Sequence, residues 1–190
     1  NTNYSSEDGV LYNKDKTEII VVPEAIKGKF TIPSSVIDIN KGAFARCRNL
    51  KNIEIPSSVN AIGDFAFSDC EGLTNITIPS SVSKIGDYAF STCKNLASIV
   101  IPSSVTSIGD WVFSHCYSLT NIDLPSSITS IGEFAFSCCS SLSSIVIPES
   151  VTSISDCAFY ECSSLTDRES AERGTSVGVR VELGGRRITK

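Results

Sequence analysis

The stretch that decides the fold is residues 78–93, which read Ile-Pro-Ser-Ser-Val-Ser-Lys-Ile-Gly-Asp-Tyr-Ala-Phe-Ser-Thr-Cys. The same phrase recurs with small changes, so that six copies follow one another at a constant spacing of 23 residues. The copies start at Ile32, Ile55, Ile78, Ile101, Leu124 and Ile147. A fixed period of about 20 to 50 residues is typical of a solenoid, in which each repeat forms one coil and contacts its neighbours.

Each repeat contains three apolar patterns, which we describe by position, counting 1 to 23 from the Ile or Leu before Pro. Positions 19, 22 and 1 are apolar, and this alternation predicts a short strand with one face inward. Pro at position 2 ends the strand because it has no N–H group. Val at position 5 and Ile at position 8 predict a second short extended piece. Gly at position 9 permits a turn, and apolar residues at positions 12, 13, 16 and 19 predict a short helix.

One column of cysteines and one column of acids share this spacing. Six of the eight Cys occupy position 16, where we expect buried free thiols that pack as small apolar groups. Only Cys138 and Cys157 lie outside the column, and both a disulfide between them and two free thiols fit the sequence. We expect the acids at position 10 to cap the short helices rather than to bind calcium. They are Asp64, Asp87, Asp110, Glu133 and Asp156.

Composition excludes some classes of function. The formal net charge of −5 argues against nucleic-acid binding, because phosphate recognition needs a clustered positive surface. No apolar run of about 18 residues exists, so no membrane-spanning helix is expected. The sequence contains no Met and no signal-peptide pattern, and we expect the chain to be a piece of a longer protein.

The two ends of the chain differ from the repeats. Residues 1–27 contain two β-rich runs around a polar turn, which predict a hairpin that caps the first coil. Residues 28–166 hold the six repeats. Residues 167–190 break the pattern and carry five of the seven Arg. Within them, residues 177–183 alternate as a capping strand does, although a flexible tail fits the composition as well.

The repeat Leu-x-x-Ile-x-Ile-Pro-x-Ser-Val-x-x-Ile-Gly-x-x-Ala-Phe-x-x-Cys resembles the BspA-type leucine-rich repeat over residues 8–166. The resemblance implies an α/β solenoid, a right-handed horseshoe with a parallel β-sheet on its concave face and short helices or turns on its convex face. It also implies a secreted or cell-surface protein of a bacterium or protozoan, used for adhesion or protein recognition. The family offers no catalytic motif to transfer to this chain.

The residues give little support to catalysis. His115 is the only histidine and occupies position 15, which differs in every copy and is therefore expected to face solvent. The nearby thiols belong to the column that we expect to be buried, whereas a reactive thiol needs exposure and a lowered pKa. Single Cys residues one repeat apart do not form a zinc pattern, which needs paired ligands. We therefore expect no enzyme, no metal site and no cofactor.

Two exposed surfaces are candidates for binding. On the concave face, positions 20, 21 and 23 point outward and form a polar, mildly acidic surface without the Trp, Tyr and Arg anchors of strong interfaces. Its candidate residues are Lys51, Asn52, Glu54, Asn75, Thr77, Ser98, Val100, Asn121, Asp123, Ser144 and Val146. Position 11 holds an aromatic column, which either forms a ridge for a partner or packs between neighbouring coils. This column is Phe65, Tyr88, Trp111 and Phe134.

Two functions fit these features. The first is a non-enzymatic recognition or adhesion module that binds an extracellular protein of a host or of the matrix. The second is a structural spacer that holds another domain of a larger surface protein away from the surface. The repeat architecture and the family resemblance favour the first, and the weak anchors on the concave face favour the second.

Overall fold

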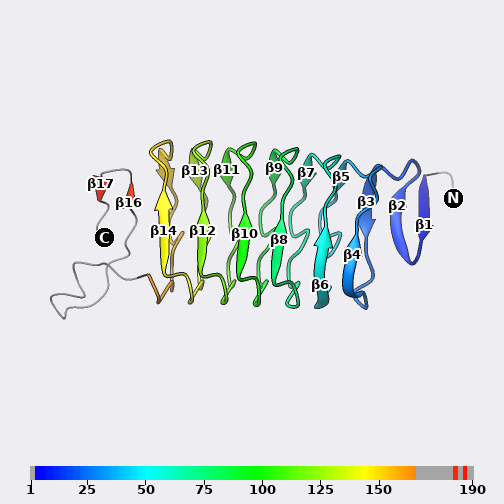
Figure 1. Cartoon of the computed structure of the whole chain (residues 1–190), viewed down its shortest axis with the longest axis horizontal. Helices are drawn as coiled ribbons and strands as arrows, with labels where there is room; N and C mark the ends of the chain where they lie inside the picture. The colour runs from blue at the N-terminus through cyan, green and yellow to red at the C-terminus, as the bar shows by residue number, and fades with distance from the viewer. Residues whose placement is uncertain (1–2, 166–181, 184–185, 188–190) are drawn as a thin grey trace.

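The structure, a computed structural model, describes residues 3–165 and the backbone of residues 182–183 and 186–187. Figure 1 shows the coils side by side along the long axis, from the N-terminal hairpin at one end to the last coil at the other. The predicted solenoid of parallel strands is confirmed. The described residues contain strands and turns but no helix, so the short helices that the repeat pattern predicts are replaced by turns.

One strand from each coil lies in a row along the stack, which we call the main sheet although its hydrogen bonds divide it into two groups. Four strands pair in parallel, with equivalent positions of neighbouring repeats side by side. They are β8 (Asn75–Thr77), β10 (Ser98–Val100), β12 (Asn121–Asp123) and β14 (Ser144–Ile147). A parallel pair precedes them in the stack, namely β4 (Lys27–Thr31) and β6 (Asn49–Glu54).

The C-terminal segment adds to the same sheet. β16 (Glu182–Leu183) pairs in parallel with β14, and β17 (Arg186–Arg187) pairs antiparallel with β16. The capping strand expected over residues 177–183 coincides with β16 at residues 182–183. The rest of that segment lies outside the described residues.

A second set of short parallel strands lies behind the main sheet in Figure 1, also with one strand in each coil. These strands are β5 (Asp38–Ile39), β7 (Ala61–Ile62), β9 (Lys84–Ile85), β11 (Ser107–Ile108), β13 (Ser130–Ile131) and β15 (Ser153–Ile154). The N-terminal strands are β1 (Tyr4–Glu7), β2 (Val10–Asn13) and β3 (Glu18–Val21). They pair antiparallel in this order, and β3 continues in parallel onto β5.

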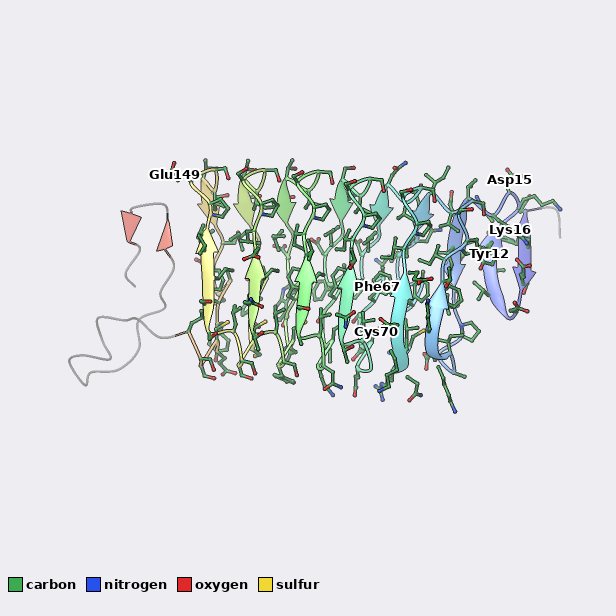
Figure 2. All side chains as sticks on the ribbon, viewed as in Figure 1. Tyr12, Asp15, Lys16, Phe67, Cys70 and Glu149 are labelled. Atoms are coloured by element: carbon green, nitrogen blue, oxygen red, sulfur yellow. The ribbon has the colours of Figure 1, made fainter. Side chains whose placement is uncertain are left out.

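The apolar positions of the repeat meet between the two sets of strands. Phe67 and Cys70 are fully buried there, as the equivalent residues of the neighbouring coils are (Figure 2). The rings at position 13 stack along the axis, with Phe67 and Phe90 5.4 Å apart and 5° from parallel. A single coil lacks partners for these side chains, so the stack of coils is what forms the core.

Turns replace the expected helix because the backbone N–H groups at positions 11 and 13 find partners in the next coil. Phe65 N–H donates to the Asp87 carbonyl at 2.9 Å, and Phe67 N–H donates to the Ala89 carbonyl at 2.8 Å. A helix would require these groups to bond carbonyls four residues earlier in their own coil. In addition, Phe65 and Asp69 have φ angles of 56° and 58°, which a right-handed helix excludes. The inward side chains keep their helical spacing although the backbone is not helical.

Candidate functional site

The main sheet has one face on the core and one face exposed. On β8, Asn75 and Thr77 are exposed and Ile76 is buried, because successive side chains of a strand point to opposite sides. We call the exposed side the outer face; it is the side that the repeat pattern places on the concave surface. All the concave-face candidates are exposed on it, namely Lys51, Asn52, Glu54, Asn75, Thr77, Ser98, Val100, Asn121, Asp123, Ser144 and Val146.

The chemistry of the outer face changes along the stack. At the N-terminal end, Lys29 Nζ lies 2.6 Å from Glu54 Oε1, and Thr31 Oγ1 donates to Glu54 Oε2 at 2.8 Å. These two contacts lower the pKa of the Glu54 carboxyl from its ordinary value. Over β10, β12 and β14 the outward positions 20, 21 and 23 carry one charge, that of Asp123. The pattern of the sequence predicted the exposure of these residues but not this difference in pairing.

The aromatic column packs between coils. Its half-buried rings stack face to face, with centroid distances of 4.5 Å for Phe65–Tyr88, 5.7 Å for Tyr88–Trp111 and 4.2 Å for Trp111–Phe134. Sugar and base ligands stack on ring faces, whereas this column presents its edges to solvent. A role of these edges in partner binding stays a prediction.

The ends of the aromatic column are also covered. Lys41 Nζ lies 5.5 Å from the centroid of the Phe65 ring, a distance typical of a cation–π contact. At the other end, Tyr160 lies edge-on to Phe134 with centroids 6.3 Å apart. The outermost ring faces therefore already have neighbours.

Three of the five acids at position 10, namely Asp64, Asp87 and Asp110, link coils rather than cap helices, which corrects the sequence-based expectation. Asp64 Oδ1 accepts a hydrogen bond from Asp87 N–H at 3.2 Å, and Asp110 Oδ1 accepts one from Glu133 N–H at 2.7 Å. The reason is that no helix follows these residues, whereas an N–H group of the next coil lies within reach. In the part of the chain that the structure describes, no group of three or more acidic, His or Cys side chains is arranged to hold a metal ion.

One contact resembles catalytic machinery and was missed by sequence reasoning. Ser114 Oγ lies 2.7 Å from His115 Nδ1, the distance of a nucleophile and its base. However, Ser114 is 0% exposed, and its hydroxyl also lies 3.2 Å from Ser137 Oγ. A substrate has no access to this oxygen. The neighbouring Cys116 is also buried, and burial raises the pKa of its thiol to about 12.

The six thiols of the cysteine column are buried, and all eight cysteines of the chain are free. Cys138 is half-buried and Cys157 is exposed, and neither forms a disulfide. In the column, Cys70 Sγ donates to the Phe44 carbonyl of the preceding coil at 3.1 Å. Cys therefore suits position 16 because it is small and apolar and still carries a weak donor.

Comparison with known families and structures agrees with the fold. The model of the family described as "BspA type Leucine rich repeat region" matches residues 25–110 and 83–181, with six copies of the repeat. None of the curated proteins matches the chain. None of the described residues forms a helix long and apolar enough to span a bilayer.

Three solved structures illustrate the similarity. A leucine-rich repeat protein from Eubacterium ventriosum is 33% identical, with a TM-score of 0.77, over 88% of this chain and 51% of that protein. A leucine-rich repeat protein from T. pallidum is 25% identical, with a TM-score of 0.70, over 92% of this chain and 94% of that one. A leucine-rich cell surface protein from Faecalibacterium prausnitzii is 31% identical, with a TM-score of 0.63, over 90% and 41%. The chain thus spans about half of the first of these proteins.

Proposed function

The chain belongs to the BspA type leucine-rich repeat family, and we propose that it is a non-enzymatic recognition or adhesion module of a secreted or cell-surface protein. Stacked repeats offer extended surfaces that proteins of this architecture use for binding partners. A location outside the cell is supported by the F. prausnitzii relative, which is described as a cell surface protein. The partner that we propose is an extracellular protein of a host or of the matrix.

The outer face of the main sheet is the observation that carries this proposal. Its side chains repeat in register from strand to strand, since Ser98 pairs with Asn75 and Asn121 pairs with Ser144. Every candidate residue on it is exposed, and no described segment of the chain covers it. A partner could therefore contact several coils at once.

Binding to immobilised matrix and serum proteins tests the proposal. We expect saturable binding by the chain and a loss of about tenfold or more for Asn121→Arg, which adds bulk and charge on β12 of the outer face. The matched control is Ser83→Arg, which adds the same side chain at an exposed site outside the main sheet. Binding that is equally strong in both variants, or no saturable binding to any protein, would overturn the proposal.

A structural spacer is the second candidate, and one observation favours it. Within residues 3–165, the outer face has no Trp, Tyr or Phe at positions 20, 21 and 23, and its only exposed apolar side chains of appreciable size are Val100 and Val146. Strong interfaces usually depend on aromatic and Arg anchors. A spacer predicts that neither the chain nor its Asn121→Arg variant binds any protein of the panel.

A further inference from the structure

We propose that β10, β12 and β14 form a subsite for a Lys or Arg side chain of the partner, with Asp123 as the anion that receives it. This inference rests on the proposed function, because it names the chemistry that the outer face recognises. It commits to an extended, basic protein segment as the occupant.

Asp123 lies between two exposed apolar side chains. It pairs in register with Val100 on β10 and with Val146 on β14, and adjacent strands are about 4.8 Å apart. Val100 is 65% exposed and Val146 is 66% exposed. Among the residues that the structure describes, the Asp123 carboxylate has neither an ion pair nor a hydrogen bond.

Another coil of the chain shows how a carboxylate at this position forms an ion pair. Glu54 occupies position 23, as Asp123 does, and Lys29 at position 21 of the preceding strand reaches it at 2.6 Å. For Asp123, the residue at position 21 of the preceding strand is Ser98, whose hydroxyl carries no charge. Position 23 thus carries a carboxylate in both places, once with a cation on the preceding strand and once without. A Lys or Arg side chain of the partner supplies the cation that is missing beside Asp123.

The surrounding charge favours a cationic occupant. Residues 95–165 contain no Lys and no Arg but six carboxylates, and the nearest described Arg backbone on this sheet, that of Arg187 on β17, lies three strands from Asp123. The six are Asp110, Asp123, Glu133, Glu149, Asp156 and Glu161. Charge of one sign steers an oppositely charged partner and disfavours an acidic one.

The two valines favour a side-chain cation over a metal ion. Lys and Arg have aliphatic stems that pack on apolar surface while the charged group reaches an anion. Contact with Val100 and Val146 would also exclude water from the ion pair, and a fully exposed pair contributes little. A divalent metal ion instead needs several converging oxygen ligands, and the outward positions of these three strands supply one carboxylate.

Fluorescence anisotropy of the full chain with a fluorescein-labelled octapeptide of alternating Arg and Thr tests the subsite. We expect the peptide to bind and its Glu-for-Arg analogue not to bind. Asp123→Asn should weaken binding about tenfold by removing the anion. Ser98→Lys should weaken it similarly, because it places an internal cation where Lys29 stands relative to Glu54. Glu133→Gln, which removes the same charge from an exposed site outside the outer face, should change binding less than about twofold.

Each other outcome refutes the subsite. Absence of binding by the wild-type chain, retention in Asp123→Asn, or an equal loss in Glu133→Gln would each overturn it. The binding assay with immobilised matrix and serum proteins distinguishes failure of the subsite from failure of the proposed function. If Asn121→Arg abolishes binding of such a protein while Asp123→Asn leaves it unchanged, the outer face recognises the partner and the cation subsite does not exist. If neither peptide nor protein binds, both proposals fail.

Discussion

Asp87 Oδ1 accepts a hydrogen bond at 2.9 Å from the backbone N–H of Asp110, which lies one coil further along the stack. A Cβ atom at the adjacent Gly109 would collide with the same oxygen. The acid at position 10 therefore depends on the glycine at position 9 of the next coil. The carboxylate reaches the neighbouring N–H group only because the glycine leaves room for it.

Gly109→Ala should destabilise the fold by about 1–3 kcal/mol, the usual cost of overpacking. Asp87 Oδ1 is the obstacle, since the next side chain, that of Val112, would lie 3.6 Å from a Cβ atom at Gly109. Combining Gly109→Ala with Asp87→Ala should therefore add almost nothing to the cost of Asp87→Ala alone. Urea unfolding of both single variants and the double variant measures this coupling.

Gly86→Ala with Asp64→Ala is the matched control cycle. At Gly86 the added Cβ would lie 2.5 Å from the backbone nitrogen of Asp64 and 2.7 Å from the carbonyl carbon of Gly63. Removing the Asp64 side chain leaves these backbone contacts in place. Equal rescue in both cycles would show that the carboxylate is not what excludes a side chain at Gly109.

Phe90→Ala should lower the free energy of unfolding by about 3–5 kcal/mol, as truncation of a buried Phe does. The ring is fully buried and stacks on Phe67 at 5.4 Å and on Phe113 at 5.7 Å, so its removal leaves a cavity within the axial stack. The exposed Asn75→Ala should stay within about 0.5 kcal/mol. An unchanged urea midpoint for Phe90→Ala would contradict the position of this ring in the core.

The repeat made the interior predictable from the sequence. With a period of 23 residues, equivalent side chains stack, so an apolar position such as that of Phe67 or Leu73 is buried in every internal coil. The same spacing wrongly predicted a helix, because it reports which side chains point inward and not where the N–H groups bond. The partner of Phe65 N–H is a carbonyl in the next coil.

The candidate site was predictable to the same extent. Alternation along the strands gives the exposure of Asn75, Asn121 and Asp123, because it depends only on local geometry. The pairing of Lys29 with Glu54 depends on two side chains on different strands. Only after the strands are placed in register does the absence of a cation beside Asp123 stand out within the described coils.

Alkaline pH should destabilise the fold through the buried thiols. Burial raises the pKa of Cys116 to about 12, whereas a thiol in an unfolded chain has a pKa of about 8.5. Between these values the unfolded chain loses a proton that the folded chain retains, so the free energy of unfolding falls as pH rises. One such thiol contributes roughly 1.4 kcal/mol per pH unit at most.

Urea unfolding of the wild type and Cys116→Ala at pH 7.5 and pH 10 isolates this effect. The difference in stability between the two proteins should shift by roughly 1–2 kcal/mol in favour of the variant at the higher pH. Cys157→Ala is the control, because this thiol is exposed in the folded chain. A difference that stays constant with pH for Cys116→Ala would rule out the buried, protonated thiol.

Trp111→Ala separates the two roles that the aromatic column could have. The indole ring stacks on Phe134 at 4.2 Å and on Tyr88 at 5.7 Å, so its loss should cost about 1–3 kcal/mol from stacking and burial. Trp111→Phe keeps a ring in the stack and should cost about 1 kcal/mol or less. Because the column packs between coils, binding to an immobilised partner should change less than about twofold in both variants. Stability unaffected by Trp111→Ala together with lost binding would instead make the column a contact surface for the partner.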